Sequence, residues 1–263
     1  MRLIKYLAFL IIPVIAVMHG CESNDKVTNS VCIPQPVNRK VLVEFFTNSG
    51  CIPCVAAHSY LDGITANTCT TINHTSVIII SVHTKYPYIL DSLYRANISQ
   101  NDARANYYGV QSTPFASLDG VNMGQFSSVD WSSQIDTSFR KAIKYLNITL
   151  SNNFNPNTDS GTVTANLDLL SPIPASDNVI HIIITESNIP YITAPNGVKY
   201  PDDVMRYMIT GSGGEDITIG NSNVVTKPYG LNAKWNKDEC YITVFVQSKS
   251  TKQVFGVERI KVN

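Results

Sequence analysis

Two cysteines three positions apart, Cys51 and Cys54, are the residues of this chain best suited to chemistry. They bound the segment Cys-Ile-Pro-Cys, which lies between an apolar run and a stretch that favours helix. Unpaired N–H groups and the positive end of the dipole stabilise a thiolate at a helix start. A cysteine there has a lowered pKa and exchanges more readily than a free thiol. The spacing predicts thiol–disulfide exchange, with Cys51 as nucleophile and Cys54 as resolving thiol.

Two other roles are open to this pair. A tetrahedral zinc site needs about four ligands. Cys51, Cys54 and His58 supply at most three on one helix, and the chain has no second CxxC. We therefore predict neither a metal nor another cofactor. A structural disulfide is the main alternative to a redox-active one.

A strand, a short turn and a CxxC at a helix start form the layout of a thioredoxin-like redox site. Such domains hold a cis-proline beside the cysteines, and the backbone before it pairs with an extended substrate. Thr113-Pro114 precedes a short predicted strand, Phe115 to Leu118, and the turn Asp119-Gly120, as that layout requires. We predict that Pro114 is this cis-proline, the alternative being an ordinary trans turn proline.

Two further side chains are candidates for the site. Glu44 lies in the apolar run before the cysteines and, if buried, could relay a proton to or from Cys54. A partly exposed or hydrogen-bonded Glu at the sheet surface is equally open. His83 ends the next apolar run, at the end of the sheet that carries the CxxC. It could stabilise the Cys51 thiolate or touch substrate, or it could be a surface histidine.

The elements around these residues follow from their patterns. Val41 to Phe46 and Thr75 to Val82 are continuous apolar runs typical of buried strands, with a predicted helix from Cys51 to about Ala66 between them. A strand, helix and strand in this order predict parallel strands. Leu90 to Tyr108 is predicted to be mostly helical. Apolar residues at helical spacing, with Ser128 as a cap, predict the helix that closes this part.

From Leu146 onward the apolar period changes from 3.6 to 2. The predicted strands are 146–150, 161–169, 178–185, 204–210, 240–247 and 254–262. Short strands without helices predict an all-β sandwich. The fold class is therefore an α/β thioredoxin-like domain over 37–146, followed by an all-β sandwich domain over 147–263.

The first residues are typical of an export signal. A basic start and a short apolar run lead to Gly20-Cys21, which predicts a lipoprotein signal peptide over 1–20 and lipidation of Cys21. His19 stands where a small or apolar residue is usual. An ordinary signal peptide or a short membrane anchor is the alternative. Residues 21–36 are predicted to hold the lipidated cysteine and a polar tether.

An exported protein can keep disulfides, and this chain has six cysteines. Cys32 precedes the first core strand and Cys69 follows the first helix, which runs back beside that strand, so we predict a structural Cys32–Cys69 disulfide. Cys240 is in phase with apolar residues on a strand, so we predict a buried thiol. The formal net charge is zero and basic residues form no stripe, which disfavours a nucleic-acid partner.

These residues resemble the 28-kDa outer-membrane lipoprotein family, a branch of the thioredoxin-like superfamily. The resemblance rests on a few motifs: Val41–Thr47, Cys51-x-x-Cys54 with Ala57-His58, a strand ending in His83, Thr113-Pro114, and Val204–Met208 leading to Gly214-Glu215. Val55 departs from the proline common in the family at that place. The resemblance implies a lipid-anchored protein of the cell envelope, in the outer membrane, whose family activity is poorly defined.

Our leading prediction is a cell-envelope thiol–disulfide oxidoreductase that exchanges with a protein thiol or disulfide. Cys51, Cys54, Thr113 and Pro114 would form its site, and the lipid on Cys21 would attach it to the membrane. The alternative is a non-catalytic outer-membrane or surface binding protein with a structural CxxC disulfide. Its binding surface could include the Tyr-containing loop from Tyr191 to Tyr200.

Overall fold

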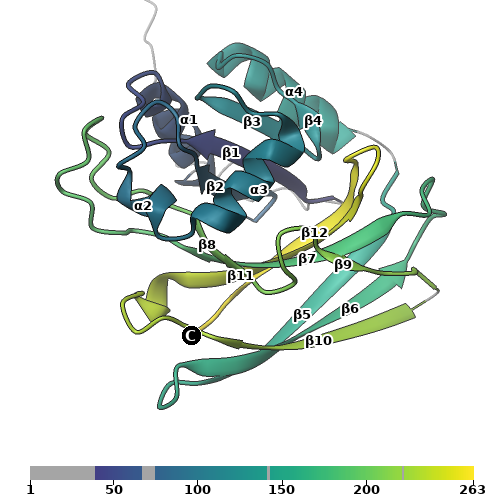
Figure 1. Ribbon diagram of the computed structural model, residues 1–263. Coiled ribbons are helices and arrows are strands. Elements are labelled where there is room, and N and C mark those ends of the chain that lie inside the picture. Colours follow the sequence, from purple (N-terminus) through teal and green to yellow (C-terminus); the bar gives the residue numbers. More distant parts are fainter. Residues whose placement is uncertain (1–38, 67–74, 141–142, 221) are drawn as a thin grey trace, which may run out of the picture. The chain divides into compact units, whose positions relative to one another are not determined.

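A large mixed β-sheet and the helices beside it form the part of the chain that holds the cysteine pair (Figure 1). The computed structural model describes residues 39–263 except 67–74, 141–142 and 221. The predictions for the signal peptide, the tether, Cys21 and the Cys32–Cys69 disulfide concern residues outside this described part. The described residues all belong to one compact unit, Ile33–Asn263.

Helices and strands are mixed up to Arg140, and strands dominate after it. The first group is β1 (Val41–Thr47), α1 (Cys54–Ala66), β2 (Val77–His83), α2 (Ser92–Arg95), α3 (Ile98–Tyr108), β3 (Phe115–Leu118), β4 (Val121–Asn122) and α4 (Ser128–Arg140). The second is β5 (Leu146–Asn155), β6 (Ser160–Leu169), β7 (Asn178–Glu186), β8 (Val204–Met208), β9 (Glu215–Asp216), β10 (Ser222–Gly230), the 3-10 turn η1 (Lys237–Glu239), β11 (Cys240–Ser248) and β12 (Val254–Lys261). The sequence therefore indicated most elements, but not β4, β9, β10 or η1.

Strand β1 is buried on both faces, which explains its unbroken apolar sequence. It pairs in parallel with β2, as predicted, and antiparallel with β3. Val43 and Phe45 belong to the cluster that contains the cysteines, whereas Leu42 and Phe46 belong to a second cluster. Successive side chains of a strand point to opposite faces, so β1 separates two cores.

One sheet runs through both halves of the chain, in the order β12-β11-β7-β8-β2-β1-β3-β4, with β9 beside β7. The junction is the parallel pair β2–β8, at Ser81 and Val204. The core on the α3 side of this sheet combines Phe46 and Ile80 with Met208 and Phe245. The predicted parts 37–146 and 147–263 are thus not two separate units, although the change from helices to strands does fall near Leu146.

Three further strands form a second sheet, in the order β10-β6-β5. Its apolar residues pack against those of β7 and β11 in one cluster, which joins Leu146, Val163 and Leu167 to Ile182 and Val244. Strand β10 lies at an edge and contains Pro228, a residue that edge strands tolerate. That proline weakens the strand signal in the sequence.

Some predicted boundaries were wrong for local reasons. Helix α1 begins at Cys54, not at Cys51. The predicted helix over 90–108 is divided, because the side chain of Asn97 accepts a bond from Gln100 N and starts a new helix. The hydroxyl before α4 that accepts a bond from Asp130 N is that of Ser127, not of Ser128.

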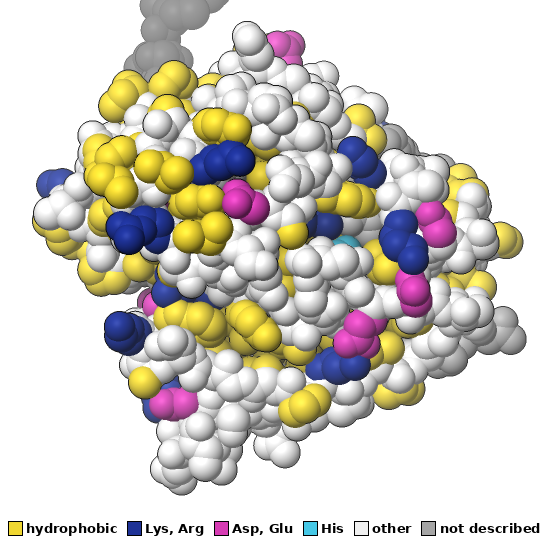
Figure 2. All heavy atoms as spheres, viewed as in Figure 1, with side chains coloured by type: hydrophobic (Ala, Val, Ile, Leu, Met, Phe, Trp, Pro, Cys, Tyr) yellow, Lys and Arg dark blue, Asp and Glu magenta, His cyan; other side chains and the backbone are white. Residues whose placement is uncertain are grey.

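Charged side chains of both signs are interspersed on the face shown in Figure 2.

Candidate redox site

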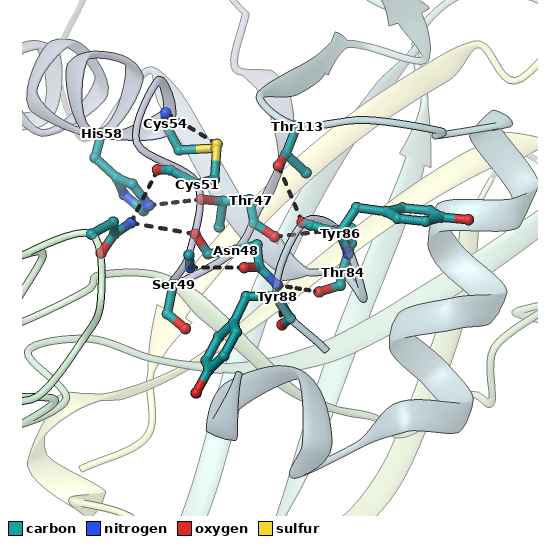
Figure 3. The surroundings of a disulfide bond; sticks show 12 residues. Thr47, Asn48, Ser49, Cys51, Cys54, His58, Thr84, Tyr86, Tyr88 and Thr113 are labelled. Carbon is teal, nitrogen blue, oxygen red and sulfur yellow. Dashed lines mark hydrogen bonds between the residues drawn. A yellow bond between two sulfur atoms is a disulfide. The ribbon is translucent and has the colours of Figure 1, made fainter. Parts of the chain in front are cut away.

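Cys51 and Cys54 form a disulfide at the start of α1 (Figure 3). Cys51 lies in the turn after β1, and Cys54 is the first residue of the helix. The backbone N–H of Cys54 donates to Sγ of Cys51 at 3.2 Å. Cys51 is 1 % exposed and Cys54 is 0 % exposed, whereas Ile52 between them is 65 % exposed. The amide contact that would stabilise a Cys51 thiolate is therefore present, but both cysteines are buried.

The loop after β2 holds the turn 48–51 from one side (Figure 3). The amide of Asn48 donates to the carbonyls of Thr84 at 2.7 Å and Tyr88 at 2.9 Å. The N–H of Gly50 donates to Oδ1 of Asn48 at 2.8 Å. A Cβ on Gly50 would lie 2.4 Å from Cβ of Tyr88, so only glycine fits at this position. The turn before the disulfide is thus fixed by packing as well as by hydrogen bonds.

Asp91 links His83 to the same turn. One carboxylate oxygen of Asp91 lies 2.6 Å from Nδ1 of His83 and accepts from Ser49 N at 2.8 Å. The other accepts from Leu93 N at 2.9 Å and caps α2. Burial raises the pKa of Asp91, but His83 and the two backbone N–H groups lower it by more. His83 is 3 % exposed, so it is not the surface histidine that the sequence left open.

His58 is part of this site, although the sequence suggested it only as a metal ligand. Its Nε2 lies 3.0 Å from Oγ1 of Thr47, and its ring packs edge-on against Phe45. Burial, and then the neighbouring His83, lower the pKa of His58 to about 3. His58 is therefore neutral near pH 7. The described residues contain no group of three or more His, Cys, Asp or Glu placed to hold a metal ion.

The Thr113-Pro114 bond is cis, as predicted from the sequence. Phe115, the next residue, pairs with Phe46 near the end of β1. The proline loop therefore lies at the end of the sheet where the chain turns toward Cys51. The hydroxyl of Thr113 donates to the carbonyl of Tyr86 at 3.2 Å, beside a second cis bond at Tyr86-Pro87 that the sequence did not indicate.

Glu44 lies on the opposite face of β1, and its predicted role as a proton relay to Cys54 is wrong. Its carboxylate accepts from Nε of Arg104 at 2.5 Å and from Nη2 of Arg104 at 2.8 Å. The hydroxyl of Tyr108 also donates to it, at 2.6 Å. Strand alternation places Glu44 with Leu42 and Phe46, away from the cysteines. The apolar run alone did not show which face the cysteines would occupy.

A loop from the second half of the chain reaches the cysteine turn. The N–H of Asn196 donates to the carbonyl of Ser49 at 2.7 Å. Its side-chain amide donates to the carbonyls of Asn48 at 3.3 Å and Cys51 at 3.4 Å. The sequence suggested this region as a separate binding surface. About 145 residues separate Asn196 from Cys51, so no local pattern could indicate the contact.

Cys240 is a free, fully buried cysteine of β11, as predicted. Burial, and then the charge of Glu186, raise the pKa of its thiol to about 12. It packs with Ile242 and Val244 in the core between the two sheets. No described helix combines the length and apolar composition needed to cross a membrane.

Comparison with solved structures supports the mixed architecture. HBP35 of Porphyromonas gingivalis matches with a TM-score of 0.73 at 13 % identity, covering 88 % of this chain and 77 % of that one. At this identity the likeness shows the fold alone. A domain of the outer membrane lipoprotein Omp28 from P. gingivalis matches with a TM-score of 0.35 at 19 % identity, covering 46 % of this chain and 90 % of the domain. The comparison with curated proteins gave no match.

The family of this chain is shown by a match to a family model. The model of outer membrane protein Omp28 matches residues 101–263, which is more than half of the chain. This segment begins after Cys51 and Cys54, so the assignment does not depend on the cysteine pair. It includes Thr113-Pro114, the second half of the large sheet and all of the three-stranded sheet. The chain therefore belongs to the Omp28 family and is a protein of the outer membrane.

Proposed function

We propose that this Omp28-family protein is a cell-envelope thiol–disulfide oxidoreductase whose site is Cys51–Cys54 in a thioredoxin-like part. The proposal rests on one hydrogen bond: at the start of α1, the backbone N–H of Cys54 donates to Sγ of Cys51. A positioned N–H and the helix dipole favour a thiolate at this sulfur, which is what an exchanging pair needs. The cis-proline loop at the same end of the sheet supports the proposal.

The exchange we propose starts from the disulfide. A thiolate of a partner protein attacks Sγ of Cys51, the Cys51–Cys54 bond breaks, and Cys54 leaves as a thiolate that takes up a proton. The second thiol of the partner loses its proton and attacks the partner sulfur of the mixed disulfide, releasing Cys51 as a thiolate. Two electrons and one proton pass from the partner, which enters as one thiolate and one thiol, to the pair, which ends as a Cys51 thiolate and a Cys54 thiol; the partner leaves with a disulfide. The reverse sequence reduces a partner disulfide.

The chain's own groups have distinct roles in this scheme. The Cys54 N–H stabilises the Cys51 thiolate released in the second step. His58 is neutral near pH 7, so it contributes no positive charge to that thiolate. The backbone at Thr113 is where an extended partner segment would pair. We propose a protein dithiol or disulfide as partner, and attachment to the membrane through a lipid on Cys21.

The reduction potential of Cys51–Cys54 tests the proposal. The mature protein would be titrated with glutathione, and its thiols alkylated and counted by mass. A potential between about −270 and −120 mV is the range of thiol–disulfide enzymes and would support exchange. Cys54→Ser should accumulate a mixed disulfide at Cys51, and Cys51→Ser should abolish it. No mixed disulfide in Cys54→Ser would contradict the assignment of the nucleophile.

Burial of the pair favours a second candidate, a non-catalytic outer-membrane binding protein with a structural disulfide. Cys51 is 1 % exposed, so a partner thiolate reaches its sulfur only after the site opens. A structural disulfide typically has a potential below about −300 mV and resists glutathione. The same titration therefore separates the two functions.

A further inference from the structure

Residues Asn188–Pro201, between β7 and β8, form a loop whose two sides are joined by backbone hydrogen bonds. Tyr191 N donates to Lys199 O at 2.7 Å, and Ile189 N donates to Pro201 O at 3.2 Å. At its tip, Gly197 N donates to Ala194 O at 2.9 Å, and Gly197 has a φ of 84° that suits glycine. The tip is therefore held in one shape by backbone bonds.

The tip of this 188–201 loop contacts the cysteine turn through Asn196. Three carbonyls of the turn, those of Asn48, Ser49 and Cys51, accept from the backbone or side-chain N–H groups of Asn196. The hydroxyl of Tyr191 adds a contact of 3.3 Å to Oγ of Ser49. These bonds go to carbonyl and hydroxyl oxygens, not to the sulfurs of the disulfide. Figure 3 shows the disulfide between α1 and Thr113.

We propose that Asn196 is a positioning residue that sets the redox equilibrium of Cys51–Cys54, so that the β-rich half of the chain controls the cysteine pair. The inference rests on the proposed function. Cys54 is fixed on α1, whereas Cys51 lies in the turn that Asn196 holds. When the disulfide is reduced, the sulfurs separate to non-bonded distance, and we expect the carbonyl of Cys51 to move with its sulfur. The hydrogen bonds of Asn196 are then stronger in the disulfide form than in the reduced form. The difference in their free energy favours the disulfide form.

The first test compares reduction potentials. Asn196→Ala removes the two side-chain bonds to the turn, and also the bond that its Oδ1 accepts from Val198 N at 3.1 Å, but keeps the backbone donor. We expect its equilibrium constant for reduction to rise about three- to tenfold, which is a less negative potential by about 15–30 mV. Thr193→Ala is the matched control, because Thr193 is exposed on the same loop. Tyr191→Phe removes the hydroxyl that contacts Oγ of Ser49 and accepts from Ser92 N, and it should shift the constant in the same direction by less.

A second measurement uses the wild-type protein and needs no variant. Hydrogen exchange at the N–H of Asn196 should be about tenfold faster in the reduced form, since its bond to Ser49 weakens. A purely structural loop would exchange equally in both forms. Equal exchange rates, or an unchanged potential in Asn196→Ala, would overturn the inference.

These outcomes are distinct from failure of the proposed function. If glutathione does not reduce the wild-type pair, the exchange function fails. The equilibrium is then measured against dithiothreitol, a stronger reductant. A shift in Asn196→Ala with none in Thr193→Ala would still establish the coupling.

Discussion

At Glu44, one carboxylate accepts from three donor groups, two of Arg104 and one of Tyr108. Arg104 is 1 % exposed and also donates to Gln247 at 2.8 Å. Burial lowers the pKa of Arg104, but Glu44 and the tyrosines raise it by more, so the guanidinium stays charged. Glu44 and Arg104 therefore stabilise the fold only as a pair, since either charge alone would be buried without a partner of opposite charge.

We expect Glu44→Gln to lower the free energy of unfolding by about 3–5 kcal/mol, because it leaves Arg104 buried and charged. Urea denaturation followed by circular dichroism measures this. The control is Asp136→Asn, which breaks an exposed pair with Arg140 and should leave the midpoint nearly unchanged. Equal effects of the two substitutions would contradict the buried-pair argument.

His58 predicts a dependence of stability on pH. Its pKa is about 3 in the folded protein and ordinarily 6.5. Between these values the unfolded chain binds a proton that the folded chain does not, so stability decreases as pH falls from about 6.5 toward 3. His58→Gln should reduce the slope by about 1.4 kcal/mol per pH unit between about pH 4 and 6. Parallel curves for both proteins, from urea unfolding at each pH, would count against it.

At the scale of elements, the β3–β4 turn packs against the turn between β11 and β12. Val254 N donates to Asp119 O at 3.1 Å. A Cβ on Gly120 would lie 1.8 Å from the carbonyl oxygen of Lys252. This contact joins a hairpin of the first half to a hairpin of the second.

Gly120→Ala should separate these two turns. We expect a loss of more than about 2 kcal/mol in unfolding free energy, from the clash added to the cost of a positive φ. Gly124→Ala is the matched control: Gly124 also has a positive φ, but a Cβ there would meet nothing within 4 Å. Its cost should be about 1 kcal/mol. If the two variants have equal midpoints in urea, the contact with Lys252 contributes nothing.

The sequence predicted elements better than it predicted their contacts. The apolar runs of β1 and β2 and the proline before β3 have local signals, so these elements and the cis bond were predictable. The face of the sheet that Glu44 occupies was not predictable, because the sequence does not show on which face the turn after β1 places the cysteines. Asn196 was not predictable either, because its loop is brought to the site by the pairing of β8 with β2, and pairing between strands so distant in sequence leaves no local signal.

For the whole molecule, the shared sheet predicts a single unfolding transition. The core on the α3 side contains residues from both halves, so neither half can keep its packing alone. The two tryptophans give a reporter in each half, Trp131 in α4 and Trp235 before η1. In Trp131→Phe and in Trp235→Phe, the urea midpoint from fluorescence should coincide with that from far-UV circular dichroism. Two separate midpoints in either variant would show that the halves unfold independently.

The buried thiol of Cys240 has a consequence for oxidation during folding. Its pKa of about 12 leaves almost no thiolate in the native protein, so oxidants of the cell envelope cannot pair it with another cysteine. The nascent, unfolded chain has no such protection. We therefore expect the Cys240 thiol to resist oxidation once β11 lies in the core, and to be open to mispairing in the unfolded chain.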